Sequence, residues 1–265
     1  MICITHMPVT PPQLCGMEIL GYLASILIGI SLGLIGGGGS ILTVPVLVYL
    51  LGVEPVQATA YSLFIVGATS LVGAVPKYRQ GMVSLKTAII FGAPAIAAVY
   101  ATRKFIVPAI PNELFSLGSL TITKSILLML LFAVLMVFAS YSMIKDKKDK
   151  GNGETGEQRF NYPMILLEGT VVGILTGLVG AGGGFLIIPA LVLLSKLPMK
   201  QAVGTSLVII AAKSLIGFLG DIGQQDIDWL LLGSVSALAI GGIFVGNWLC
   251  LLYTSDAADE EDSVD

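Results

Sequence analysis

The sequence predicts an all-α polytopic membrane protein made of two inverted repeats. Of its 265 residues 55% are hydrophobic and 12% are charged, about half the ~25% charged residues of a soluble domain. Apolar runs of about 18 residues or more recur, and each can cross the ~30 Å hydrocarbon core of a bilayer. A shift of 144 residues aligns the second half of the chain with the first without a gap.

Long apolar runs predict the membrane spans. They lie at 17–36, 55–75, 87–107, 122–144, 163–180, 199–219 and 229–252. Two shorter apolar pieces, 41–52 and 185–196, follow glycine clusters. At about 1.5 Å per residue these pieces rise only about 18 Å, which is too short for a comfortable crossing. We therefore expect two half-helices, so that each repeat has a glycine-broken helical hairpin plus three spans.

The internal repeat is the most informative pattern. "GLIGGGGSILTVPVLV" (33–48) aligns with "GLVGAGGGFLIIPALV" (177–192), and 19 of the 41 positions across 33–73 are identical. Apolar composition alone would align leucines and valines, but not a glycine cluster, a proline, a glutamine and two serines in register. The two halves are therefore predicted to be copies of one fold.

The positive charges predict opposite orientations for the two halves. The basic segment 145–159 is expected in the cytoplasm by the positive-inside rule. The connection 76–86 carries three basic residues, whereas the equivalent connection 220–228 carries only acidic ones. Equivalent loops thus face opposite sides, as inverted repeats require. Arg103 and Lys104, at the predicted outer end of a span, argue against this orientation.

The predicted segments follow from these patterns. They are a disordered N-terminal extension (1–16), a first transmembrane repeat (17–144), a cytoplasmic linker (145–161), a second repeat (162–253) and an acidic tail (254–265). The partner of span 122–144 would lie beyond residue 265, so we expect the second repeat to lack its last span. The tail is interpreted as non-native sequence, with a regulatory role as the alternative.

The glycine clusters predict a binding site. Non-helical backbone persists at membrane depth only where it is buried in protein or lines a cavity, and a helix N-terminus that follows such a break presents free N–H groups and a partial positive charge. Two breaks related by inversion would meet near the bilayer midplane and hold an anion. The alternative is that the glycines only allow close helix packing. Duplication of the cluster favours the site.

Polar side chains near the breaks extend this prediction. Those after the half-helices, in "QATAYS" (57–62) and "QAVGTS" (201–206), would donate to oxyanion oxygens or bond between helices. Lys213 lies inside an apolar span, where a lysine costs several kcal/mol unless it faces a cavity or a partner; we expect it to attract the anion, with snorkelling as the alternative. The predicted substrate-binding residues are Gly36, Gly37, Gly38, Gly39, Ser40, Gln57, Thr59, Ser62, Gly180, Gly182, Gly183, Gly184, Gln201, Thr205, Ser206 and Lys213.

Other chemistry has little support in the sequence. Glu168 is a candidate for proton coupling or for pairing with Lys213, or it serves at a helix end. The chain has one histidine (His6), widely spaced cysteines and no HExxH, nucleophile-elbow or phosphate-loop motif. We expect no enzyme activity, no cofactor, no metal and no nucleic-acid partner.

The doubled motif resembles a known family. "GLIGGGGSILTVPVL" and "GLVGAGGGFLIIPAL", each followed by "QATAYSL" or "QAVGTSL", are similar to the two signature repeats of the TauE/SafE family of sulfite exporter-type permeases. The resemblance covers about residues 17–252. It implies a secondary transporter of the bacterial inner membrane that moves sulfite, sulfoacetate or other organosulfur anions through the lipid bilayer without ATP. A membrane scaffold or assembly protein remains the alternative, and substrate, direction, coupling ion and oligomeric state stay open.

Overall fold

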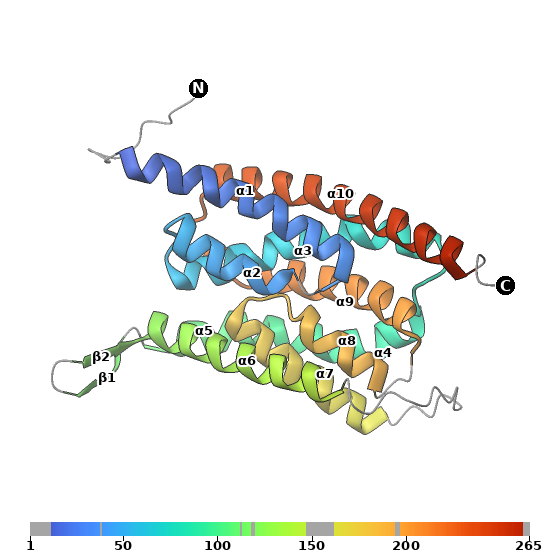
Figure 1. The fold of residues 1–265 in the computed structure, drawn as a ribbon. Helices are drawn as coiled ribbons and strands as arrows, with labels where there is room; N and C mark the ends of the chain where they lie inside the picture. Colours follow the sequence, from blue (N-terminus) through green and yellow to red (C-terminus); the bar gives the residue numbers. More distant parts are fainter. Residues whose placement is uncertain are drawn as a thin grey trace.

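The computed structural model describes residues 12–37, 39–111, 113–117, 120–146, 162–193 and 197–261. Within these ranges the chain is a bundle of helices (Figure 1). Four helical stretches are long and apolar enough to cross a membrane: Pro55–Arg79, Leu85–Ala109, Met199–Leu219 and Trp229–Cys250. Shorter apolar helices cover Ile19–Leu34, Ser40–Leu50, Lys124–Val137 and Met164–Val179. The predicted class, a helical membrane protein, is confirmed.

Every predicted span coincides with a helix. In the first half these are α1 (Pro12–Ile35), α2 (Ser40–Pro45), the π-helix η1 (Val46–Leu50), α3 (Pro55–Arg79), α4 (Leu85–Ala101), η2 (Thr102–Ile106), α5 (Val107–Ala109) and α6 (Lys124–Asp146). In the second half they are α7 (Tyr162–Val179), α8 (Gly184–Leu193), α9 (Met199–Leu219) and α10 (Trp229–Glu261). The half-helices α2–η1 and α8 follow the two glycine clusters.

Three features differ from the prediction. Helix α1 begins at Pro12, inside the extension 1–16 that was predicted to be disordered. An antiparallel hairpin, β1 (Glu113–Leu117) with β2 (Leu120–Thr123), precedes α6. The run "TIT" (121–123) favours a strand because its residues are β-branched. Helix α10 also continues beyond the predicted span to Glu261, through alanines and glutamates that favour helix. The linker residues 147–161 and the termini 1–11 and 262–265 lie outside the described residues.

Helices α3 and α9 cross at the centre and run in opposite directions. A Cβ on Gly67 would lie 2.9 Å from Leu215, and one on Gly73 would lie 3.8 Å from Leu207. The partner's number falls as the number in α3 rises, so the two helices are antiparallel. The small residues at these contacts allow the backbones to approach closely.

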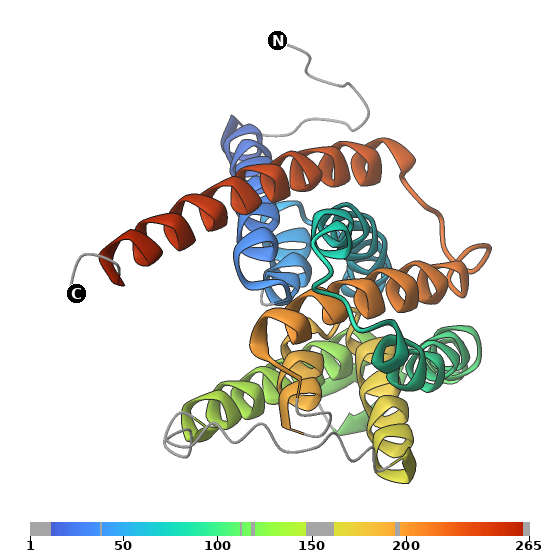
Figure 2. The ribbon, with the colours of Figure 1, turned by 90° about the vertical axis from the view of Figure 1, so that its right-hand side faces the viewer.

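The outer helices pair across the two halves. Helix α1 packs along α10, and α4 packs along α7 (Figures 1 and 2). A Cβ on Gly33 would lie 2.8 Å from the carbonyl of Ile243, and one on the equivalent Gly177 would lie 3.4 Å from the carbonyl of Val99. Each half therefore buries its first helix against the other half.

Reciprocal contacts relate the two halves. Ser84 donates its N–H to Thr205 Oγ1 at 3.0 Å, and Asp228, 144 residues later, donates its N–H to the hydroxyl of Tyr61 at 2.7 Å. Tyr61 and Thr205 are themselves 144 residues apart. Together with the antiparallel α3 and α9, such pairs are what inverted repeats require. That the halves cross a membrane in opposite directions stays a prediction.

Each glycine-broken segment turns back along its own half. A Cβ on Gly21 of α1 would lie 2.6 Å from Leu51, just after η1, whereas Gly39 lies beside Ile28 of α1. The half-helices end with equivalent hydrogen bonds: Val53 N–H to Leu47 O at 2.9 Å, and Leu197 N–H to Leu191 O at 3.3 Å. The hairpin of α1 with α2–η1 thus returns to the end at which it began.

Candidate functional site

The glycine clusters interrupt the helices at equivalent positions. Helix α1 ends at Ile35 before α2 begins at Ser40, and α7 ends at Val179 before α8 begins at Gly184. Gly36 has φ +76° and the equivalent Gly180 has φ +74°. Glycine reaches this region without the steric cost that a Cβ brings. Gly38 lies outside the described residues.

The two breaks lie against one another. A Cβ on Gly37 would fall 2.9 Å from the Cα of Gly184, and one on Gly182 would fall 3.3 Å from the Cβ of Ser40. The start of α2 therefore meets the start of α8. The sequence predicted that the breaks would meet, and these contacts agree with it.

One face of α3 and one face of α9 border the breaks. On α9, Val203 lies against Gly36, Ile210 lies against Gly184, and Lys213 lies against Gly183. Positions three or four apart share a helix face, so Ser206 lies on the same face. The contacts of Thr59 with Gly180 and of Val66 with Gly182 place Ser62 on the corresponding face of α3.

Lys213 is the cation at the second break. Its side chain is fully buried, and Nζ donates to Thr176 Oγ1 at 3.2 Å. The same nitrogen lies 2.8 Å from the position that a Cβ on Gly183 would occupy. The snorkelling alternative is therefore wrong. Within the described residues no carboxylate forms an ion pair with Lys213, so the alternative of a pair with Glu168 is wrong as well.

The side chains beside the two breaks differ in charge: the second break has Lys213, whereas the first has the neutral Ser40, which donates to the carbonyl of Gly37 at 2.8 Å. Thr176, Thr59 and Lys213 surround Gly180–Gly184, whereas the residues 144 positions away from them are Leu32, Val203 and Thr69. The sequence repeat predicts equivalent roles for the two breaks, and it does not single out Thr176. Comparing the two halves for polar residues opposite apolar ones would have found it.

Several predicted residues lie away from the breaks. Gln57 donates to the backbone carbonyl of Asp226 at 3.4 Å. Thr205 accepts the N–H of Ser84, and Gln201 occupies the position in α9 equivalent to Gln57. These side chains lie near the start of their helices, where Gln57 and Thr205 bond to neighbouring loops. Glu168 precedes Thr176 by eight residues, about 12 Å along α7.

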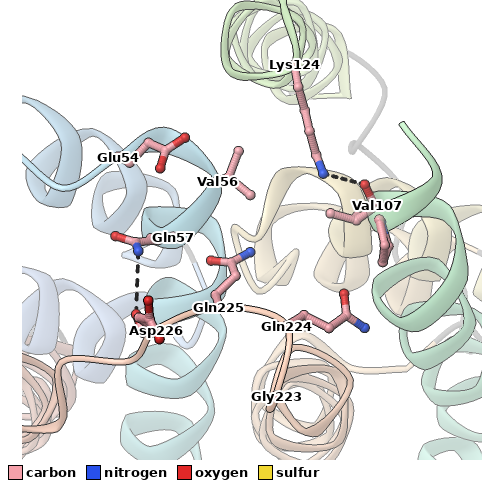
Figure 3. Close-up of a pocket in the computed structure, with 10 residues that line it drawn as sticks. Glu54, Val56, Gln57, Val107, Lys124, Gly223, Gln224, Gln225 and Asp226 are labelled. Carbon is pink, nitrogen blue, oxygen red and sulfur yellow. Dashed lines mark hydrogen bonds between the residues drawn. The ribbon is translucent and has the colours of Figure 1, made fainter. Parts of the chain in front are cut away.

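A pocket of about 680 Å³ opens where α3 and α6 begin and α5 ends (Figure 3). It is lined by Glu54, Val56, Gln57, Val107, Pro108, Lys124, Gly223, Gln224, Gln225 and Asp226. The ammonium group of Lys124 reaches from α6 and donates to the carbonyl of Val107. Two carboxylates, Glu54 and Asp226, also line the pocket, which therefore has charges of both signs.

A buried ion pair lies next to this pocket. Arg103 is fully buried, and its Nη1 lies 3.3 Å from Asp221 Oδ2 and 3.1 Å from Thr59 Oγ1. Burial raises the pKa of Asp221, against the opposing attraction of the Arg103 guanidinium. Arg103 is therefore paired inside the protein, whereas its neighbour Lys104 is exposed and still argues against the predicted orientation.

Comparison with known proteins identifies the family. The sequence model described as "Sulfite exporter TauE/SafE" matches residues 21–256, which includes both glycine breaks, Lys213 and the ion pair. The chain belongs to the TauE/SafE family. This TauE/SafE protein is thus a multi-pass membrane transporter.

Relatives of this TauE/SafE protein have general names. It is 30% identical over 239 residues to a "Probable membrane transporter protein" of Xylella fastidiosa, covering 88% of this chain and 84% of the relative. It is 27% identical over 226 residues to the "Probable membrane transporter protein YdhB" of Bacillus subtilis, covering 84% and 86%. It is also 27% identical over 207 residues to "Probable membrane transporter protein MJ0441" of Methanocaldococcus jannaschii, covering 74% and 69%. No solved structure matches the chain significantly.

Proposed function

We propose that this TauE/SafE protein is a secondary transporter that moves sulfite or organosulfur anions across the inner cell membrane without ATP. The anion is held at the second glycine break, by the start of α8 together with Lys213. One observation carries the proposal: the buried ammonium of Lys213 lies 2.8 Å from the position of a Cβ on Gly183.

The start of α8 supplies backbone donors beside this ammonium. The N–H groups of Leu186 and Ile187 both donate to the carbonyl of Gly183. Those of Gly184 and Phe185 find no acceptor in the described part of the chain. Free N–H groups at a helix N-terminus attract anions, so backbone and side chain act on the same place.

The charge balance supports an anionic ligand. A lysine inside the membrane costs several kcal/mol unless a partner or water compensates it. Lys213 has a neutral hydrogen-bond partner in Thr176 and no ion pair among the described residues. A bound anion would offset the cost of burying this charge, and release of the anion would restore that cost. This balance is expected of a site that binds and releases its ligand in each transport cycle.

Close packing is the competing explanation for the glycines, as in a scaffold or assembly protein. The contact between Gly37 and Gly184 favours it, because neither position leaves room for a side chain. Packing does not account for a buried lysine without a carboxylate partner. The two explanations therefore differ in what they predict for Lys213.

Replacing Lys213 by methionine tests the proposal. Purified Lys213→Met should insert normally and lose sulfite flux in liposomes by about tenfold or more, since a hydrogen bond to a charged group contributes ~1.5–3 kcal/mol. The matched control is Lys200→Met, which removes an exposed charge from the same helix. Normal flux through Lys213→Met would exclude Lys213 from the site.

A further inference from the structure

Most of the hydrogen-bonding capacity of Arg103 is unused. A guanidinium has five N–H donors. In Arg103 only Nη1 has partners, and the fully buried Nε and Nη2 have none in the described part of the chain. Buried donors without an acceptor are costly, so this side chain is poised to bind a further acceptor.

The Asp221 carboxylate does not satisfy the hydrogen-bond donors of the Arg103 guanidinium. One carboxylate oxygen, Oδ2, lies 3.3 Å from Nη1, and neither it nor Oδ1 has a hydrogen-bond partner among the described residues. A well-formed arginine–carboxylate pair is shorter and uses two parallel N–H···O bonds. The carboxylate thus neutralises the charge of Arg103 but leaves its remaining N–H donors without acceptors. An oxyanion with two free oxygens would neutralise the charge and also accept hydrogen bonds from these donors.

The pair lies between the pocket and the second glycine break. Arg103 precedes Val107 by one helical turn, and Asp221 precedes Gly223 by two residues; both Val107 and Gly223 line the pocket. On the other side, the Thr59 hydroxyl that accepts from Arg103 belongs to the residue that packs on Gly180. Arg103 and Asp221 are thus close in sequence to residues that line the pocket, and Thr59 connects Arg103 to the second break.

We propose that Arg103 is a second anion-binding residue of this transporter, reached through the pocket, and that the Asp221 carboxylate takes the place of the anion when the site is empty. The ligand class is a small oxyanion, such as sulfite or a sulfonate, that presents two oxygens to one guanidinium. This inference rests on the proposed function and adds a second position on the route of the same anion.

The charges around the pocket fit a selective site. Lys124 lies within electrostatic range of Arg103, Asp221 and Glu54. Because Glu54 and Asp226 offset Lys124, the pocket does not gather anions by charge alone. An anion binds Arg103 only if it competes with a carboxylate already there. Such competition makes binding reversible, which transport requires.

Neutral variants distinguish a ligand site from a structural ion pair. Binding is measured in full-length protein carrying Lys213→Met, so that the second break does not contribute, from the shift in melting temperature with increasing sulfite. Adding Asp221→Asn should lower the half-saturating sulfite concentration, by about tenfold if one charged competitor is removed. Adding Arg103→Gln should abolish the shift.

The double variant Arg103→Gln/Asp221→Asn is the decisive control, because it restores charge balance. A structural ion pair predicts that it behaves like its parent. The ligand site predicts a folded protein with no sulfite-dependent shift. The inference is overturned if sulfite does not stabilise the Lys213→Met parent, or if it stabilises the double variant equally well.

Flux with Lys213 intact separates this inference from the proposed function. There, the double variant should need a several-fold higher sulfite concentration for half-maximal flux. If its flux is unchanged while Lys213→Met loses flux, the second site is wrong and the proposed function stands. If Lys213→Met transports normally while sulfite binding still depends on Arg103, the proposed role of Lys213 at the second break fails and the second site stands.

Discussion

Lys213 of α9 and Thr176 of α7 meet beside the second glycine break, with 3.2 Å between Nζ and Oγ1. The Thr176 hydroxyl donates to the carbonyl of Val172 at 2.8 Å, which turns an oxygen lone pair toward the ammonium. Thr176 therefore fixes where the charge of Lys213 lies. We regard it as a positioning residue for the proposed site.

Removing this acceptor should weaken transport. Thr176→Val keeps the shape and loses one hydrogen bond to a charged group, worth ~1.5–3 kcal/mol. We expect sulfite flux in liposomes to fall by about tenfold while insertion is retained. Thr170→Val is the matched control, since Thr170 bonds its own helix at Leu166 in the same way. Equal flux through the two variants would mean that Thr176 has no positioning role.

A large side chain in the second break should stop transport. Gly182 has φ +63°, and a Cβ there would lie 2.5 Å from Val66. We expect Gly182→Leu to destabilise this region by ~1–2 kcal/mol from the backbone alone, with a further cost of overpacking. Gly38→Leu is expected to reduce transport in the same way, because Gly38 is the residue equivalent to Gly182 in the first repeat.

Gly233→Leu is the control for these glycine variants, because a Cβ at Gly233 meets nothing within 4 Å. Flux is normalised to correctly inserted protein, measured by size-exclusion profile. If Gly182→Leu folds and moves sulfite at the normal rate, the break is not the transport site. If it folds and loses only a protein partner, the scaffold alternative is favoured.

Cysteine labelling tests the inverted orientation. In a background without Cys3, Cys15 and Cys250, single cysteines replace Lys77 or Asp226. An impermeant thiol reagent should label them from opposite sides of the membrane, because Lys77 lies in the last turn of α3, Asp226 lies in the loop after α9, and these two helices run antiparallel. Labelling of both positions from one side would contradict the inversion.

Anion binding at Arg103 should strengthen as the pH falls. Burial raises the pKa of Asp221, so on acidification this carboxyl takes up a proton, becomes neutral and stops competing for the guanidinium. In the described part of the chain, charged groups near the pair also include Lys104, Lys124, Glu54 and Asp226. Methanesulfonate is the suitable probe, because its charge does not change in this pH range.

The measurement is the half-saturating methanesulfonate concentration across pH in Lys213→Met protein. It should decrease toward acid pH when Asp221 is present, and Asp221→Asn should flatten the dependence. A dependence of equal size in Asp221→Asn would assign it to one of the other carboxylates.

The spans and breaks are predictable from sequence because their signals are local. An apolar run has to be helical in hydrocarbon, and Gly36 and Gly180 mark where each helix stops. The hairpin β1–β2 was missed because its short alternating segments adjoin a long apolar run, which dominates the pattern.

The functional neighbours were harder to find because they are remote in sequence. Arg103 and Asp221 are 118 positions apart, and the packing of α4 against α9 brings the two regions together. Gln57 and Thr205 are predicted at the breaks from the repeated polar motifs that follow the half-helices, yet each bonds to a loop from the other half. The direction of a side chain near the start of a helix depends on the loop that packs beside it. Here that loop comes from the other half, so the local sequence does not determine the direction.

The exchange of outer helices between the halves constrains how the protein is made. About 190 residues separate the end of α1 from the start of α10, its packing partner. At ~5–20 residues synthesised per second, α1 is made on the order of ten seconds or longer before its packing partner α10. Neither half can bury its own glycine-rich helix faces. In the nascent protein these faces of the first half therefore stay without their packing partners until the second half is inserted.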